Sequence, residues 1–241
     1  MYTPPPIIFY SKINSTQDKA WEFYDKGLSN IVVLANEQSM GHGRHGRKWF
    51  SPKGGLWFSY LKTVNIQPEL LDLISTACGV AVALSLRDLN LNALIKWPND
   101  IIVNSKKIAG ILISTKIMKN KITALVIGVG LNLNVNINAF PGELREQITT
   151  VLNELKHYTD ELKTLILILQ KLDEFLDNII LNKAIIHKYA RELNYLKNRP
   201  IKALLISNKM IEDIVKDIDE SGKLITANGL ALSIYDVVQL Y

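Results

Sequence analysis

Residues 96–112 read KWPNDIIVNSKKIAGIL and contain apolar, β-branched runs separated by two turn signals. The segment Pro-Asn-Asp at 98–100 breaks the first run, and Asn-Ser at 104–105 marks a turn between two further strands. Lys107 lies inside the last apolar strand, where a lysine is costly to bury unless an anion pairs with it. Asp100 and a bound ligand are two alternatives for that anion. The stretch therefore predicts short strands joined by tight turns.

A strict strand alternation places Lys107 on the face opposite to Gly110. In the strand expected over 121–135, the part over 128–134 has one face made only of glycine and asparagine. Four residues share that face: Gly128, Gly130, Asn132 and Asn134. Glycine and asparagine leave space and hydrogen-bonding groups, which is typical of a wall that a ligand approaches. An exposed edge face without a ligand is the alternative.

Residues 41–46 read Gly-His-Gly-Arg-His-Gly, which matches the GxGxxG pattern of dinucleotide-binding turns. That turn needs a following helix and an acidic residue about 20 positions later. Residues 47–58 instead contain Ser-Pro, Gly-Gly and alternating aromatic residues, and no Asp or Glu occurs between Gln38 and Pro68. The pattern therefore excludes a dinucleotide site. It favours a glycine-rich loop that holds another anion, with a solvated basic loop as the alternative.

The chain has 241 residues, a formal net charge of +5 and one cysteine. Cys78 lies in an apolar helical pattern, where we expect it to be buried, and one cysteine permits no internal disulfide. We therefore expect a cytoplasmic protein. We see no secretory signal and no apolar run of membrane-spanning length, so we expect no membrane partner. The positive charge is compatible with nucleic acid, but the basic residues cluster in one glycine loop. A nucleic-acid-binding protein is therefore the less favoured alternative.

Periodicity predicts helices over 13–27, 68–90 and 159–196, with Ser15 or Thr16 as the N-cap of the first. Strands are expected over 30–38, 54–64, 93–115 and 121–135. After Pro200 the chain contains only short strands separated by turn residues. We predict a mixed α+β or α/β domain over 1–196 and a small all-β domain over 197–241.

Four blocks, in this order, resemble the catalytic core of the biotin protein ligases. They are NSTQ (14–17), EQSMGHGRHGRKWFSPKGGLWFS (37–59), KWPNDIIVNSKKIAGIL (96–112) and GVGLNLN (128–134). The resemblance implies a mixed-sheet catalytic domain of the biotin/lipoate ligase type over 1–196. It also implies, more loosely, a small SH3-like β-barrel at the C-terminus. The implied activity is an ATP-dependent ligase that makes biotinyl-5'-AMP from biotin and ATP. The enzyme then transfers biotin to a lysine of a biotin carboxyl carrier protein.

The resemblance also carries site residues over to this chain. Biotin would contact Ser15, Thr16, Gln17, Gln38, Gly41, His42, Gly43, Arg44, Lys107 and Gly110. ATP would contact Arg44, Arg47, Trp49, Lys96, Asn99, Asp100 and Asn132. Lys96, Lys107 and Arg44 would act in catalysis, because they oppose the negative charge of the two reacting anions. No protein-bound metal site is implied, and Mg²⁺ would enter with ATP near Asp100.

This chain departs from the family pattern at two positions of the glycine loop. His42 and His45 stand where arginine is common, so two permanent charges become titratable ones. The Asn-Ser-Thr element begins at Asn14, which leaves no room before it for the DNA-binding domain of relatives that are also repressors, so we expect no DNA partner. A carboxylase carrier domain and a second copy of the chain are the expected partners. A lipoate or octanoate ligase or transferase is the alternative, which the intact KWPND and the arginine-bearing loop disfavour.

Overall fold

The protein was analysed as a computed structural model that describes residues 2–241, and its contacts divide the chain into two units. Unit 1 comprises Met1–Pro68 and Val103–Gln170, and unit 2 comprises Glu69–Ile102 and Lys171–Tyr241. The structure contains mixed α and β elements and a separate antiparallel five-stranded sheet, which confirms the expected fold class. The boundary between residues 196 and 197 stays a prediction.

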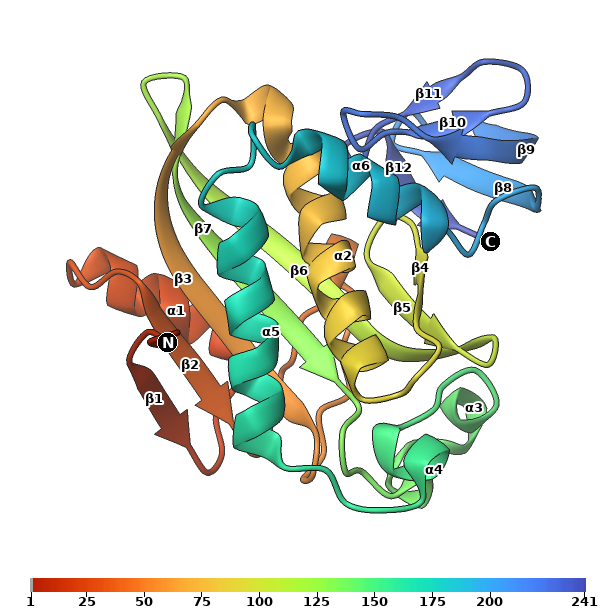
Figure 1. The fold of residues 1–241 in the computed structure, drawn as a ribbon. Helices are drawn as coiled ribbons and strands as arrows, with labels where there is room; N and C mark the ends of the chain where they lie inside the picture. The colour runs from red at the N-terminus through yellow and green to blue at the C-terminus, as the bar shows by residue number, and fades with distance from the viewer. Residues whose placement is uncertain (1) are drawn as a thin grey trace. The chain divides into compact units, whose positions relative to one another are not determined.

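The strands of unit 1 lie side by side in the order β1, β2, β3, β7, β6 (Figure 1). Their bounds are β1 Ile7–Tyr10, β2 Ile31–Ala35, β3 Leu56–Ile66, β6 Lys106–Met118 and β7 Lys121–Leu131. β1 runs parallel to β2, and the other neighbours are antiparallel. β1 was not predicted, because its four residues are too few to show a period. The central strands are apolar and largely buried, as the sequence predicts.

Helix α1, Thr16–Asp25, begins where the sequence predicts. Ser15 is its N-cap, and the Ser15 hydroxyl oxygen accepts the backbone N–H of Asp18 at 3.3 Å. Ala20 packs into an apolar cluster with β2, β3 and β7, so the helix is fixed against this part of the sheet. The shorter helices of unit 1 are α3, Gly142–Arg145, and α4, Val151–Leu155. The described residues, 2–241, contain three 3₁₀ turns: Arg44–Gly46, Pro68–Leu70 and Ile137–Ala139.

The helix expected over 159–196 is in fact two helices, so this prediction was wrong in part. They are α5, Glu161–Leu176, and α6, Lys183–Glu192. The side-chain amide of Asn182 donates to the carbonyl of Glu174 at 2.7 Å. That bond satisfies a carbonyl of the last turn of α5, which has no partner within its own helix.

Unit 2 contains α2, Leu71–Asp88, and the hairpin of β4, Leu94–Lys96, with β5, Asp100–Val103. Its five-stranded sheet has the order β11, β10, β9, β8, β12. The bounds of these strands are β8 Pro200–Leu205, β9 Met210–Ile218, β10 Leu224–Thr226, β11 Ala231–Leu232 and β12 Val237–Leu240. The sheet consists of short strands separated by turns, as expected after Pro200, and a turn separates β11 from β12.

Helix α2 and the turn before it form an apolar stretch, Pro68–Asp88, that passes the length and hydropathy test for a membrane span. We expected no stretch to pass that test. Most of the stretch is buried within the protein, as the core helix of a globular domain is. Cys78 is completely buried there, as predicted, and burial raises the pKa of its thiol to about 12.

Asp72, in the first turn of α2, holds the chain between β11 and β12. Its carboxylate is almost fully buried and accepts the Ser233 hydroxyl at 2.8 Å and the Ile234 backbone N–H at 2.7 Å. Burial raises the pKa of Asp72, although these two hydrogen bonds act in the opposite direction. The hydrogen bonds stabilise the fold, whereas the buried charge opposes it.

Asp72→Ala and Asp72→Asn separate these two effects. Alanine leaves two buried donors without an acceptor, so the free energy of unfolding should fall by about 1–3 kcal/mol. Asparagine keeps an acceptor for Ile234 and a hydrogen-bonding group for Ser233 without the charge, so it should match or exceed the wild type at neutral pH. The raised pKa means that the wild type loses stability as pH rises through the folded value, so the advantage of asparagine should grow from about pH 4 to 7. Urea unfolding at several pH values measures these free energies of unfolding. An Asp72→Asn variant as unstable as Asp72→Ala would contradict the account.

Candidate functional site

The glycine- and arginine-rich loop of unit 1 is a short closed turn. The backbone N–H of Gly43 donates to the carbonyl of Arg47 at 2.6 Å, and the N–H of Trp49 donates to the carbonyl of Gly41 at 2.8 Å. Gly46 has a φ of +73°, which glycine adopts at little cost. A Cβ at Gly41 would lie 2.6 Å from the Trp49 carbonyl oxygen, so the loop requires glycine there.

The Trp49 indole lies across a glycine pair on neighbouring strands. Gly110 of β6 and Gly130 of β7 are register partners. A Cβ at Gly110 would lie 2.8 Å from the indole ring, and a Cβ at Gly130 would overlap it. The indole N–H is buried and has no hydrogen-bond partner in the part of the chain that the structure describes. The glycine face is therefore a close-contact wall, as the sequence indicates, and the protein's own tryptophan contacts it.

Lys107 lies on the side of this wall that Trp49 occupies. Its Nζ is 4.8 Å from the centroid of the Trp49 ring, above the ring face. A Cβ at Gly110 would lie 3.3 Å from Lys107 Cε, so the alternation that put these two residues on opposite faces was wrong. The cause is a change of pairing: Lys107 exchanges backbone hydrogen bonds with Gln147 and Thr149 at 2.9 Å. Paired β6 and β7 positions begin two residues later.

A buried cluster of hydrogen-bonded polar side chains, called the polar pocket below, lies at the start of α1. Gln38 Oε1 accepts the backbone N–H of Thr16 at 2.8 Å. Gln17 is buried, and its side-chain amide nitrogen donates to the carbonyl of Val126 at 3.0 Å. A Cβ at Gly128 would overlap the Gln17 carbonyl oxygen. Gly128 thus makes room for Gln17 in the way that Gly130 makes room for the indole.

His42, which stands where relatives commonly have arginine, ties the loop to α1. Its Nε2 lies 2.8 Å from Asp18 Oδ2, in the first turn of the helix. The neighbouring guanidinium of Arg47 donates through Nε to the carbonyl of Arg44 at 3.2 Å. The loop therefore brings His42, Arg44 and Arg47 together within one turn.

Asn132 and Asn134, which follow the last residue of β7, bond to other parts of the chain. The Asn132 side-chain amide is buried and donates to the carbonyl of Thr149 at 3.0 Å. Asn134 donates to the carbonyl of Thr159 at 2.8 Å. These amides fix the chain after β7, so only the glycine half of the predicted face is a close-contact wall. A nucleotide contact for Asn132 stays a prediction.

The remaining predicted residues belong to the β4–β5 hairpin of unit 2. Lys96 and Asp100 are register partners, so their side chains leave the hairpin on the same side. Asn99 lies in the turn, which contains a cis Trp97–Pro98 bond. The buried Trp97 indole donates to the carbonyl of Gly222 at 3.0 Å and anchors the hairpin within its unit.

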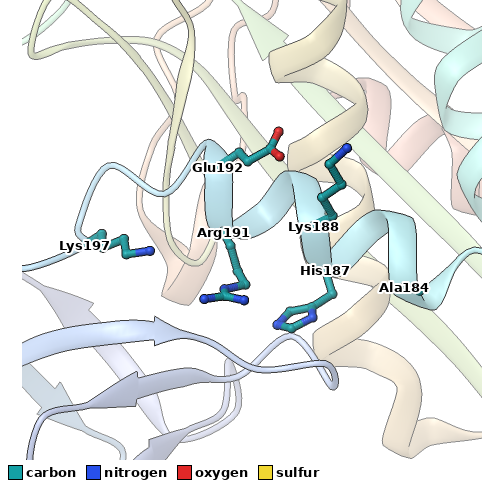
Figure 2. Close-up of a pocket in the computed structure, with 6 residues that line it drawn as sticks. All are labelled: Ala184, His187, Lys188, Arg191, Glu192 and Lys197. Atoms are coloured by element: carbon teal, nitrogen blue, oxygen red, sulfur yellow. The ribbon is translucent and has the colours of Figure 1, made fainter.

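Two cavities are resolved outside the wall. One, of about 490 Å³, is lined in part by Gln38, Lys48, Phe50 and Ser51. The other, of about 340 Å³, lies along α6 and contains no predicted residue (Figure 2).

Two side chains that line the α6 cavity, Arg191 and His187, have partners on β9. Arg191 Nε donates to Asp217 at 2.7 Å, and His187 Nε2 donates to the carbonyl of Ile218 at 3.0 Å. These groups join α6 to β9. Within residues 2–241, no group of three His, Cys, Asp or Glu side chains could hold a metal ion.

The sequence interpretation missed three polar groups around Gln17. Ser59 of β3 donates to Gln17 Oε1 at 3.0 Å, and Ser114 of β6 accepts from Gln17 Nε2 and Trp21 Nε1, each at 2.8 Å. The signal was a serine inside a run of buried apolar residues. Such a hydroxyl needs a partner, which makes it a candidate member of a buried network.

Gly130→Ala tests the contact between the wall and the indole, and Gly142→Ala is its control, because a Cβ at Gly142 meets open space. The added methyl at Gly130 should displace Trp49 and cost about 1–3 kcal/mol of stability. Tryptophan fluorescence should shift, and quenching by iodide should rise, for Gly130→Ala alone. Identical spectra for the two variants would contradict the contact.

Residues 9–132 match the model of the Biotin/lipoate A/B protein ligase family. The chain is 32% identical to the bifunctional ligase/repressor BirA of Bacillus subtilis over 148 residues, which are 60% of this chain and 46% of that protein. It is 33% identical to the biotin–[acetyl-CoA-carboxylase] ligase of Paracoccus denitrificans over 120 residues, 43% of this chain and 45% of that protein. The chain thus spans about half the length of these relatives. Its fold is similar to that of the Aquifex aeolicus biotin protein ligase in complex with biotin and ATP, with a TM-score of 0.82, 24% identity and 98% of each chain covered. Because the family model matches more than half of its length, the chain belongs to the Biotin/lipoate A/B protein ligase family.

Proposed function

We propose that this protein is an ATP-dependent biotin protein ligase. The observation that carries the proposal is the arrangement of unit 1. A buried polar cluster of Thr16, Gln17 and Gln38 and a cation at Lys107 lie on the same glycine face, the first beside Gly128 and the second beside Gly110. Biotin has the matching chemistry, with a polar ureido ring at one end and a carboxylate at the other. The relatives named as biotin ligases support the same assignment.

The pocket at α1 receives the uncharged end of biotin in this proposal. Ser15, Thr16 and Gln38 offer hydroxyl and amide groups that match the donors and the acceptor of a ureido ring. Gln17 lines the pocket, since its amide already bonds to Ser114, Val126 and Ser59 within the protein.

In the first step, a biotin carboxylate oxygen attacks the α-phosphorus of ATP. An O–P bond forms, the bond to pyrophosphate breaks, and biotinyl-5'-AMP results. Two anions must approach each other, so the residues contribute chiefly positive charge that is fixed in advance. Lys107 holds the carboxylate, and Arg44 of the glycine loop lies against the newly formed linkage.

In this proposal, Arg47, Trp49 and Asn132 of unit 1 contact the nucleotide. A nucleotide contact for Lys96 and Asn99 of unit 2 stays a prediction. Bound Mg²⁺ supplies further charge neutralisation for the phosphates. Asp100 would hold it, which fits the preference of Mg²⁺ for one or two carboxylates together with phosphate oxygens.

In the second step, a lysine amine of a carrier protein attacks the carbonyl carbon of the mixed anhydride. A C–N bond forms, AMP leaves, and the amine loses its proton. The carrier is the biotin carboxyl carrier domain of acetyl-CoA carboxylase or a related carboxylase. We further propose a cytoplasmic homodimer, since this chemistry needs ATP and a carboxylase partner.

Mass spectrometry of a carrier domain mixed with the protein, biotin and MgATP tests the proposal. We expect one biotin per carrier, at one lysine, only when all four components are present. Parallel reactions with lipoate or octanoate in place of biotin test the other activities of the family. Modification by lipoate or octanoate alone would replace the proposed substrate with theirs.

Lys107→Ala should abolish adenylation, and Lys106→Ala is the matched control on the adjacent residue of β6. Loss of the Lys107 amine removes fixed positive charge from the reacting carboxylate, so biotinyl-5'-AMP formation should fall by about a hundredfold or more. Biotin-dependent exchange of pyrophosphate into ATP measures this step without a carrier. Near-normal exchange in folded Lys107→Ala protein would refute its role.

Arg44→Gly should release the intermediate, with Lys121→Ala as a control for net charge. Loss of a charged hydrogen bond costs about 1.5–3 kcal/mol, so escape of biotinyl-5'-AMP should rise roughly tenfold or more. Escaped adenylate labels unrelated lysines, which blotting of an added bystander protein detects. Bystander labelling equal to that of the control would show that Arg44 does not retain the adenylate.

A further inference from the structure

We infer that Ser59 is a positioning residue that sets the hydrogen-bond polarity of the pocket in which the ureido ring binds. This inference rests on the proposed function and deepens it. Ser59 lies in the middle of β3 and is completely buried. Its hydroxyl oxygen is 2.8 Å from Thr16 Oγ1 and 3.0 Å from Gln17 Oε1, so it connects two residues of the pocket.

The direction of each hydrogen bond around Ser59 follows from one fixed acceptor. The carbonyl of Val126 can only accept, so the atom of Gln17 beside it at 3.0 Å must be the amide nitrogen. The carbonyl oxygen of Gln17 therefore points to Ser59, whose single hydroxyl proton must be donated to it. Ser59 is then the acceptor in its bond with Thr16, and the Thr16 hydroxyl proton points away from the ligand.

A second series of hydrogen bonds fixes the orientation of the Gln38 side-chain amide in the same way. Because the Thr16 backbone N–H can only donate, the Gln38 atom 2.8 Å away is the carbonyl oxygen. The Gln38 amide nitrogen then donates to Ser51 Oγ at 2.9 Å, and Ser51 donates to the carbonyl of Trp49 at 3.3 Å. Gln38 has two N–H groups, of which Ser51 takes one.

These directions specify what the pocket offers to a ligand. Thr16 Oγ1 presents lone pairs as an acceptor, because its proton is given to Ser59. Gln38 presents its second N–H as a donor. Ser15 Oγ accepts the backbone N–H of Asp18, so its hydroxyl proton is a further donor. A ureido group, with N–H donors beside a carbonyl acceptor, matches this set, whereas the apolar end of an octanoyl chain matches none of it.

Without the Ser59 hydroxyl, the hydrogen bonds that orient these two side chains are lost. The Thr16 hydroxyl keeps only Gln38 Oε1, 3.1 Å away, as its acceptor, and Gln17 Oε1 becomes a buried acceptor without its Ser59 donor. Ser59 does not contact the reacting carboxylate or the nucleotide in this scheme. Its effect should therefore appear in biotin binding and not in ATP binding.

Ser59→Ala, with Ser85→Ala as the matched control, tests the inference. Ser85 is also completely buried, but its hydroxyl donates to the carbonyl of Ala81 within α2, outside the pocket. For Ser59→Ala we expect the biotin KM in pyrophosphate exchange to rise about tenfold, the equivalent of about 1.4 kcal/mol, with the ATP KM within about twofold of wild type. For Ser85→Ala we expect both values within about twofold.

Ser59→Cys is a second variant that should fold even if Ser59→Ala does not. The cysteine side chain has nearly the volume of serine, and its S–H is a weaker hydrogen-bond donor. Its biotin KM should fall between those of the wild type and Ser59→Ala. A biotin KM unchanged in both Ser59 variants, or an ATP KM raised as much as the biotin KM, would overturn the inference. Absence of biotin-dependent exchange in the wild type would instead refute the proposed function, so the two failures are distinguishable.

Discussion

The close contact between the Trp49 indole and two facing glycines is the constraint on which this site depends. The antiparallel register of β6 and β7 places Gly110 opposite Gly130, and no larger residue leaves room for the ring at either position. The indole in turn lies under the Lys107 amine and follows directly after the glycine loop. Strand register, loop and the Lys107 amine are therefore coupled through one side chain.

The site separates two kinds of chemistry in space. The pocket at α1 is neutral and is built from hydrogen bonds whose directions are fixed by backbone groups, at Thr16 and Val126. The part of the glycine face beside Gly110 is cationic, with Lys107 and the arginine-bearing loop. A ligand with a polar neutral ring and an acidic tail fits such a division, because each end meets groups that satisfy it.

Much of the fold could be predicted from the sequence, because its strands and helices have clear periods and turn residues. The Ser15 N-cap and the buried Cys78 follow from local rules, and the structure has both. The break between α5 and α6 was missed, because the bond from Asn182 back to Glu174 is not visible as a change in apolar period. β1 was missed because short strands depend on their neighbours.

The residues predicted for the site stay predictions, and their geometry was only partly predictable from the sequence. The glycines of β7 indicated a wall, but the sequence does not show that Trp49 and Gln17 are the side chains that reach it. Strand alternation placed Lys107 on the wrong face, because its backbone pairs with residues distant along the chain. Ser59 illustrates the general limit: a buried hydroxyl indicates a partner, but only the fold identifies it.

A crystal structure of this protein with bound biotin tests the central claim most directly. The account predicts one biotin molecule with its ureido ring against Thr16 and Gln38 and its carboxylate within hydrogen-bond distance of Lys107 Nζ. Biotin bound with the opposite orientation, or in the cavity along α6 with the wall unoccupied, would contradict it.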